Sequence, residues 1–167
     1  MPDITFMSGL PGGGKSTLID QDGDSDQLVC PDDIRMAWGH VYHQPLEPMV
    51  HALCQTMVRA AMLRGRDVVV DECLTKLERI QPYLEMAKEF GYSCHILVLT
   101  TPVEVCIQRT LNRNDGHPWE DIIYKKAMQW ITDWPFIARK FKTESIVGWP
   151  YTPDTLVEDI EYTYELF

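Results

Sequence analysis

The sequence predicts an α/β protein, a three-layer sandwich with a parallel sheet at its centre. A glycine-rich segment, residues 9–17, stands between a strand pattern and a helix pattern. Further along, apolar strand-like runs alternate with amphipathic helical stretches. One run, residues 67–71, is apolar throughout and closed by an acid, which is typical of an interior parallel strand. Strand–helix alternation of this kind joins parallel strands through right-handed crossovers.

The individual elements follow from periodicity and from turn residues. Apolar, β-branched runs predict four strands, at residues 3–7, 27–30, 67–71 and 94–99. Helical patterns predict a short helix from Lys15 to near Gly23, then helices at 46–63, 77–90, 103–113, 120–130 and 135–141. Thr101 and Pro102 suit a capped start for the helix at 103–113, and Gly91 suits the end of the helix at 77–90. Residues 31–35 are expected to form a loop, and the pattern is weak from Ser145 onward.

Length and composition favour one ordinary domain. The chain has 167 residues, of which 45% are hydrophobic, so residues 1–167 are expected to form a single domain with a real core. No apolar run reaches the roughly 20 residues of a membrane span, and no signal peptide pattern is present. Five cysteines without a C-x-x-C pair indicate free thiols in a reducing cytoplasm.

The charge of −10 argues against a general coat for nucleic acid, because nonspecific affinity for phosphates comes from Lys and Arg. A local basic cleft remains compatible with it. The acids concentrate at residues 20–26 and in the C-terminal segment, about 150–167. The first cluster fails as a calcium loop, because Ser25 and Pro31 occupy the positions that need Gly and Glu. A solvated turn is the better interpretation.

The segment at residues 9–17 satisfies G-x-x-x-x-G-K-[ST]. Its glycines let successive N–H groups face one concavity, where they meet the phosphates of a nucleotide above a helix N-terminus. Lys15 would reach the β- and γ-phosphates and Ser16 would ligate Mg²⁺. The sequence therefore predicts binding of a nucleoside triphosphate, expected to be ATP, with Mg²⁺. The residues expected to bind the nucleotide are Gly9, Pro11, Gly12, Gly13, Gly14, Lys15, Ser16 and Thr17.

Ligands of such folds lie at the carboxyl ends of the strands. This rule gathers the phosphate loop, residues 32–35 and residues 71–75 on one edge. Asp32 or Asp33 could take the proton from an attacking hydroxyl, while Arg35 holds a phosphate of the acceptor. The alternative is that one of these acids simply caps the next helix.

Arg109 and Arg113 are four residues apart on a predicted helix, so both are expected on one face. They lead into a turn-rich segment at 112–119, which predicts a lid over about residues 109–119. A mobile arginine pair there would stabilise the charge of a transferring phosphoryl group. The alternative is two surface arginines favoured by the helix dipole.

Asp71 closes an apolar strand, as the acid of a Walker B segment does, and would support Mg²⁺ together with Ser16. With Glu72 beside it, an ATP-hydrolysing machine is an alternative, but the chain has little room for the usual helical lid domain. A GTPase would need an N-K-x-D motif, which is absent. Five aromatic residues are candidates for base stacking or for the core: Trp38, Tyr42, Trp119, Trp130 and Trp134.

Several of these features together resemble the kinase domain of phage polynucleotide kinases, the 5′-hydroxyl kinases of nucleic-acid repair. The matching segments span about residues 3–115 in the same order: residues 9–17, Asp32-Asp33-x-Arg35, Asp71 followed by Leu74, residues 85–92, and Arg109-x-x-x-Arg113. The resemblance implies a P-loop fold of the kinase type with a short helical lid. It also implies that Asp32 is the general base, that Arg35 contacts the acceptor phosphate, and that the lid arginines hold the donor phosphates.

The activity implied by the resemblance is transfer of the γ-phosphate of ATP to the 5′-hydroxyl of DNA or RNA. The 167 residues leave no room for a phosphatase domain beside the kinase domain, and Glu72-Cys73 stands where the family tends to have small polar residues. Related kinases act on hydroxymethylated pyrimidines in phage DNA, on nucleosides or on small metabolites. These acceptors are alternatives here, and a nucleotide-gated binding module without phosphoryl transfer is a third.

Overall fold

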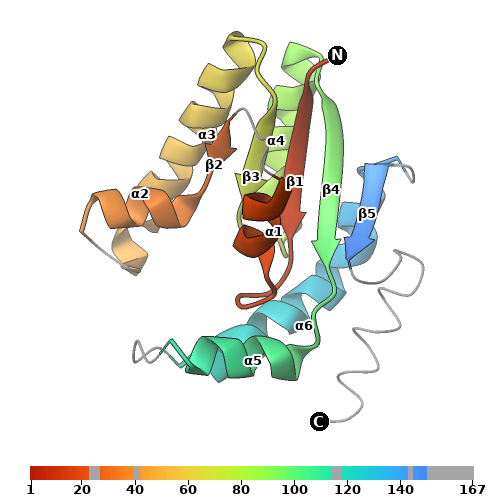
Figure 1. Ribbon diagram of the computed structural model, residues 1–167. Coiled ribbons are helices and arrows are strands. Elements are labelled where there is room, and N and C mark those ends of the chain that lie inside the picture. The colour runs from red at the N-terminus through yellow and green to blue at the C-terminus, as the bar shows by residue number, and fades with distance from the viewer. Residues whose placement is uncertain (23–26, 40–41, 114–117, 143–144, 150–167) are drawn as a thin grey trace.

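A computed structural model describes residues 1–22, 27–39, 42–113, 118–142 and 145–149. Its centre is one sheet in which every neighbouring pair of strands is parallel (Figure 1). The five strands are β1 (Asp3–Ser8), β2 (Leu28–Val29), β3 (Val68–Asp71), β4 (Ser93–Leu99) and β5 (Ile146–Trp149). Their order across the sheet is β2-β3-β1-β4-β5, so the first strand lies in the middle.

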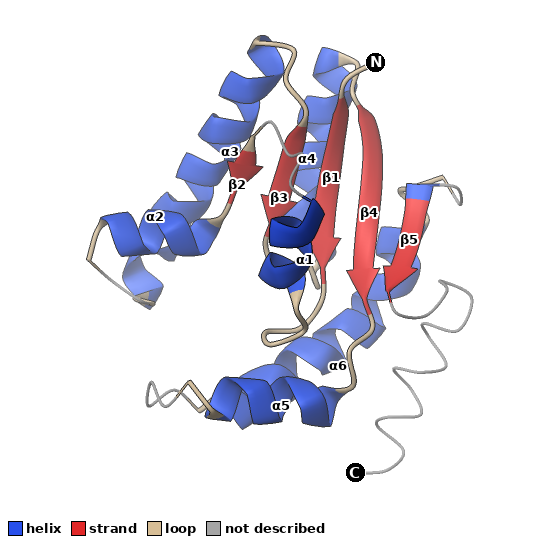
Figure 2. Ribbon diagram, in the orientation of Figure 1, coloured by secondary structure: helices blue, strands red, loops and turns tan. Residues whose placement is uncertain are grey.

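Helices lie on both sides of this sheet. They are α1 (Lys15–Asp22), α2 (Pro31–Ala37), α3 (Glu47–Leu63), α4 (Leu77–Phe90), α5 (Val103–Leu111) and α6 (Trp119–Ala138), with a short 3₁₀ turn, η1 (Gln44–Leu46), before α3. In Figures 1 and 2, α1 crosses the front of the sheet, while α3 and α4 lie behind it. The carboxyl ends of the strands point down, toward α5 and α6. The predicted α/β sandwich is confirmed.

The central strands are apolar because both of their faces are covered. Phe6 on β1 pairs with Val70 of β3 on one side and with Ile96 of β4 on the other, and all three side chains are fully buried. The Phe6 ring also contacts the Tyr83 ring on α4, at 6.1 Å between centroids. Burial of each such side chain contributes about 1.5–3 kcal/mol. This core fixes the strand ends, and the strand ends position the site.

The fifth strand was not predicted, because the pattern from Ser145 onward is too short and too weak. In the structure β5 pairs with β4, with Ile146 opposite Ile96 and Val147 opposite Leu97. Four residues with no clear alternation carry little information by themselves. The open edge of β4, where backbone N–H and C=O groups need partners, decides that this segment is a strand.

The two helices predicted at 120–130 and 135–141 are one helix, α6, which runs through Pro135. Proline removes a backbone hydrogen bond and usually ends a helix. Here a buried stripe continues past it: Ile123, Ala127, Trp130, Trp134 and Ile137. The burial of Trp134 and Ile137 on either side of Pro135 outweighs the one lost bond, so the helix continues to Ala138.

Residues 31–35 are helical, so the expected loop was wrong. Pro31 is the first residue of α2, where its fixed φ suits the helix and its missing N–H costs nothing. Cys30 occupies the capping position and makes no side-chain cap hydrogen bond. Neither Asp32 nor Asp33 is the cap. Both lie in the first turn, where negative charge is favoured by the helix dipole.

Other predictions were close. Helix α4 has the predicted bounds, and Gly91 ends it in the left-handed region with φ of 71°. All five cysteines are free. Within the described ranges, no helix combines the length and the apolar character that crossing a membrane requires. Most of the acidic cluster (23–26), the middle of the predicted lid (114–117) and the C-terminal segment (150–167) lie outside the described residues.

Candidate active site

The phosphate loop leaves the end of β1 and turns sharply into α1. Gly12 has φ of +77°, and a Cβ there would lie 2.7 Å from the carbonyl oxygen of Cys106 on α5. Gly14 has φ of +99°. Both positions therefore require glycine, for conformation at both and for space at Gly12. The loop is packed against α5, which fixes its shape.

Thr101 reinforces this packing. The sequence suggests it as a cap for the helix at 103, but Pro102 takes that position. The Thr101 hydroxyl instead donates a hydrogen bond to the carbonyl oxygen of Gly13, at 2.7 Å. The loop is also closed on itself, since the N–H of Gly13 donates to the carbonyl oxygen of Leu10 at 3.0 Å. A preformed loop reduces the entropy lost when a ligand binds.

Lys15 is buried within the loop. Its Nζ donates to the carbonyl oxygens of Gly9 and Leu10, at 3.1 and 2.9 Å. The side chain is only 9% exposed, which is rare for lysine. The ammonium group is therefore held over the concavity of the loop, where a phosphate would meet it.

Ser16 and Asp71 meet although they are 55 residues apart. The Ser16 hydroxyl donates to Oδ2 of Asp71 at 3.1 Å, because the phosphate loop and the end of β3 lie side by side. Asp71 Oδ1 is buried and has no hydrogen-bond partner among the described residues. Burial raises the pKa of Asp71, and the Lys15 charge and the Ser16 hydrogen bond oppose this. These oxygens fit Mg²⁺, which prefers oxygen ligands and keeps several waters.

On the other side of β3, Arg35 on α2 joins two carboxylates. Its Nη1 donates to Oδ1 of Asp32 one turn earlier, on an exposed side chain. Its Nε and Nη2 donate to the two carboxylate oxygens of Glu47, at 2.9 and 2.6 Å. This bidentate geometry is the strongest form of such a pair. Burial of Glu47 opposes its charge, but the hydrogen bonds and the charge of Arg35 outweigh burial and lower its pKa.

The same cluster continues inward through His51 on α3. Its Nε2 lies 3.5 Å from Glu47 Oε2, and its Nδ1 lies 3.5 Å from Glu72 Oε1. Burial, and after it the charge of Arg79, lowers the pKa of His51 to about 4, so His51 is neutral at pH 7. Burial raises the pKa of Glu72, whose Oε2 has no hydrogen-bond partner among the described residues. We call Asp32, Arg35, Glu47, His51 and Glu72 the polar cluster.

Glu47 and His51 were missed by the sequence reasoning. Glu47 lies twelve residues from Arg35, in the first turn of a different helix, and no motif links the two. An acid at a helix start is ordinarily explained by the dipole alone. Only the packing of α2 against α3 brings the pair together.

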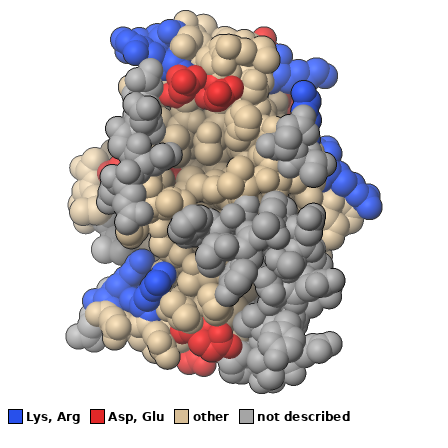
Figure 3. All heavy atoms as spheres, turned by 45° about the vertical axis from the view of Figure 1, so that its right-hand side comes forward, with Lys and Arg blue, Asp and Glu red and all other residues tan. Residues whose placement is uncertain are grey.

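The two lid arginines do not share a helix face, so that prediction was wrong. Arg109 Nη1 donates to the carbonyl oxygen of Gly12 at 3.1 Å, at the phosphate loop. Helix α5 ends at Leu111, so Arg113 lies beyond it, and its guanidinium stands 5.3 Å from the centre of the Trp119 ring. On the face in Figure 3, the described lysines and arginines lie in separate groups near the margins.

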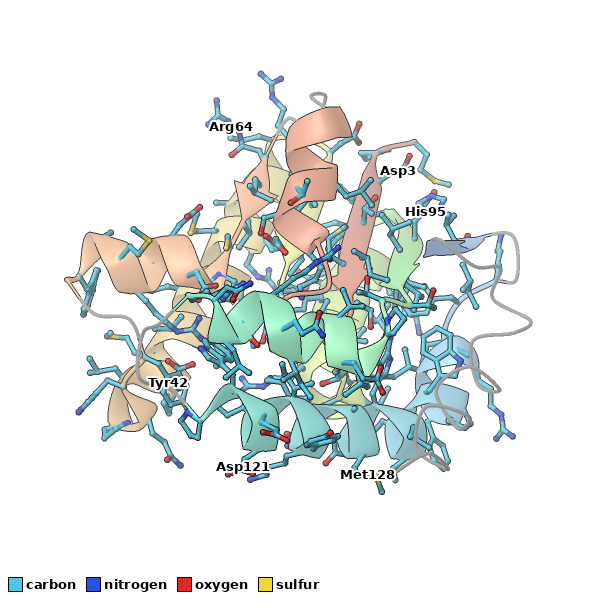
Figure 4. The ribbon with its side chains drawn as sticks, turned by 60° about the horizontal axis from the view of Figure 1, so that its bottom comes forward. Asp3, Tyr42, Arg64, His95, Asp121 and Met128 are labelled. Atoms are coloured by element: carbon cyan, nitrogen blue, oxygen red, sulfur yellow. The ribbon has the colours of Figure 1, made fainter. Side chains whose placement is uncertain are left out.

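Figure 4 looks onto the carboxyl ends of the strands. Helices α5 and α6 cross this end together, with Asp121 and Met128 on the outer side of α6. Tyr42 lies at the left of this view, beside the start of α3. Of the candidate stacking residues, Trp130 and Trp134 are buried and pack edge to face in the core. Trp38 and Tyr42 are 52% and 55% exposed.

Comparison with known proteins agrees with this geometry. A family model described as an AAA domain matches residues 4–127. The transcription factor bHLH140 of Arabidopsis thaliana is 25% identical over 118 residues, which are 68% of this chain and 12% of that protein. The chain therefore spans only about an eighth of the length of that relative.

Two solved structures share the fold at low identity. A chain of the Pnkp1/Rnl/Hen1 RNA repair complex superposes with a TM-score of 0.60 at 19% identity, over 99% of this chain and 46% of that one. A chain of the AvrRxo1-ORF1:AvrRxo1-ORF2 complex with ATP superposes with a TM-score of 0.63 at 15% identity, over 84% and 50%. With the five-stranded parallel sheet, the phosphate loop and the family match all in agreement, the chain belongs to this AAA domain family and has the fold of a P-loop kinase.

Proposed function

We propose that the chain is an ATP-dependent kinase that transfers the γ-phosphate to a hydroxyl of a nucleic acid, with the 5′-hydroxyl of a polynucleotide as the preferred acceptor. The observation that carries the proposal is the placement of Asp32. The strand order β2-β3-β1 sets α2, Asp71 and the phosphate loop side by side at the strand ends. The charges of Asp32 and Asp33 act on Asp71, which itself contacts Ser16.

On the donor side, the N–H groups of residues 9–17 and the Lys15 ammonium bind the phosphates of ATP. Lys15 exchanges its two carbonyl partners for phosphate oxygens. Arg109, already at the loop through Gly12, adds a second positive charge near the transferring group. Ser16 and Asp71 would hold Mg²⁺, which supplies charge neutralisation to the phosphates. Closure of the lid would move the Arg113 guanidinium from the Trp119 ring to the negatively charged phosphoryl group that is being transferred.

On the acceptor side, the oxygen of the acceptor hydroxyl bonds to the γ-phosphorus of ATP, and Asp32 accepts the proton of that hydroxyl. The bond between the γ-phosphorus and the bridging oxygen of the β-phosphate breaks. The products are the phosphate ester and ADP. General-base assistance of this kind contributes about 10²–10⁴-fold. Arg35 holds the Asp32 carboxylate in place, and Glu47 holds Arg35. Asp33 is also exposed but pairs with no arginine among the described residues, so we assign the base to Asp32.

The contacts of Arg35 and the net charge favour a second candidate, a kinase of nucleosides or small metabolites. The Nε, Nη1 and Nη2 atoms of Arg35 all donate to carboxylates, which leaves it less able to hold an acceptor phosphate than the sequence predicts. The net charge of −10 also repels a polyanion. An uncharged acceptor avoids both costs.

The test offers γ-labelled ATP and Mg²⁺ with three acceptors: a 5′-hydroxyl oligonucleotide, DNA containing hydroxymethyluracil, and a nucleoside. We expect the label on the oligonucleotide 5′ end, with an acceptor KM that rises with salt at a log–log slope of roughly 0.7 for each contacted phosphate. Equal efficiency on a nucleoside with a flat salt response would favour the second candidate. If the protein binds ATP but labels none of the acceptors, it is a nucleotide-binding module that does not transfer phosphate to them.

A further inference from the structure

A shallow groove lies beside the polar cluster, between α2 and the η1–α3 turn. Its lining is mainly apolar: Ile34 from α2, Trp38 directly after α2, Leu46 at the end of η1 and Val50 in α3. The paired side chains of Arg35 and Glu47 also line the groove. The residue that holds Asp32 in place is therefore part of the groove lining.

The rim of this groove is aromatic and open. Trp38 ends α2 and is 52% exposed, whereas Trp130 and Trp134 are almost fully buried. The Tyr42 ring, also exposed, lies 5.9 Å from the Arg35 guanidinium. Large aromatic side chains usually bury most of their surface, so two exposed ones beside a groove indicate a binding function.

We propose that the planar ring of the acceptor stacks on Trp38 at the open rim of this groove, while the acceptor hydroxyl reaches Asp32. The inference rests on the proposed function and deepens it by naming the acceptor as a nucleobase-bearing molecule. Asp32 lies in the first turn of α2 and Trp38 directly follows its last residue, six residues on, so the two are about 9 Å apart along the helix axis, the scale of one nucleotide. A nucleobase has an aromatic face that can stack on the Trp38 ring. It also has polar edges that can form hydrogen bonds with Arg35 and Glu47.

The alternatives fit the groove less well. A ringless sugar would cover neither exposed aromatic surface. An apolar peptide or lipid would leave the paired charges of Arg35 and Glu47 facing an apolar ligand, which is costly. Stacking on an aromatic side chain tolerates any base, so the groove selects the class of acceptor and not its sequence.

The first experiment compares Trp38→Ala with Phe136→Ala, a matched control because Phe136 on α6 is 54% exposed and lies far along the chain from the groove. The measured quantities are KM for ATP and KM for three acceptors: an oligonucleotide, adenosine and ribose. We expect Trp38→Ala to raise KM for the two ring-bearing acceptors at least about fivefold, the lower end of measured stacking contributions. KM for ATP should not change, Trp38→Phe should recover most of the loss, and Phe136→Ala should have no effect.

A second readout does not depend on phosphoryl transfer. With ADP saturating the phosphate loop, added adenosine should quench the tryptophan fluorescence of the wild type, and this quenching should be absent in Trp38→Phe. Quenching without any labelled acceptor would sink the proposed function and keep the groove as a base-binding site. Ribose phosphorylated as efficiently as adenosine, or unchanged quenching in Trp38→Phe, would overturn the inference.

Discussion

The phosphate loop and the polar cluster lie at the same edge of the sheet but are built in opposite ways. The loop takes its binding groups from residues 9–17, and its lysine is held by carbonyls of that same segment. The polar cluster takes its five residues from α2, α3 and the residue after β3. The loop also offers positive charge, whereas the cluster contains three carboxylates, one arginine and one neutral histidine.

This difference has a physical consequence. A contiguous loop keeps its shape because its glycines and its contacts with α5 leave it little freedom. A cluster drawn from several elements depends on how those elements pack, and one lost partner leaves a buried charge. We therefore expect donor binding to be insensitive to changes in the cluster, while acceptor binding responds to each of its members.

The largest effect is expected from Lys15→Ala. Removal of the ammonium group takes away the main charge that meets the donor phosphates, so we expect phosphoryl transfer to be abolished. The variant should fold, because the hydrogen bonds of Lys15 go to carbonyl oxygens of its own loop and join no distant elements. Turnover and the circular dichroism melt are measured together. Near-wild-type turnover would remove Lys15 from the donor site.

Asp32→Asn should come next. We expect turnover to fall by about 10²–10⁴-fold, because the amide cannot take the proton, while KM for ATP stays nearly constant. Asp33→Asn is the matched control, since it removes the same charge one residue along the same helix turn. If Asp33→Asn proves to be the damaging change, the base is Asp33. If neither substitution lowers turnover, the two acids act only through their favourable interaction with the dipole of α2.

Glu47→Gln should have a smaller effect, which appears partly in stability and partly in acceptor binding. It weakens the bidentate pair with Arg35, and hydrogen bonds between charged groups contribute about 1.5–3 kcal/mol, so the melting temperature should fall by several degrees. KM for the acceptor should rise, and KM for ATP should not. Glu89→Gln is the control, because the Arg59–Glu89 pair has the same bidentate geometry on the surface. An equal fall in stability in both variants would mean that the buried pair has no special weight.

The smallest expected effect is a pH dependence of stability through His51. Its pKa is about 4 in the folded chain and 6.5 ordinarily, so between these values the unfolded chain takes up a proton that the folded chain does not. The folded state therefore loses stability as pH falls from about 6.5 toward 4. His51 faces Glu47 and Glu72 and feels the charges of Arg35, Arg79 and Lys126.

Urea unfolding of the wild type and of His51→Gln at several pH values checks this expectation. Burial raises the pKa of Glu72, which acts in the opposite direction, and the difference between the two proteins isolates the histidine. The variant should show a flatter decline between pH 6.5 and 4. Parallel declines would mean that His51 is protonated in the folded protein as readily as in the unfolded one.

The sequence by itself determined the donor half of this protein. The parallel α/β fold, the phosphate loop, the strand closed by Asp71 and the end of α4 at Gly91 all follow from local rules of periodicity and turn chemistry. Each of these features is predicted by patterns that lie within stretches of a few residues. Their interpretation needs no knowledge of distant contacts, and the structure places them as expected.

Only the tertiary structure decided the rest. Helix α6 passes Pro135 because Trp134 and Ile137 are buried around it, and Ile146 enters a strand because β4 offers an open edge. Arg35 is a partner of Glu47 because α2 packs against α3, across twelve residues that carry no shared motif. Contacts between distant segments depend on how helices and strands settle against one another, and residue spacing along the chain does not encode that arrangement.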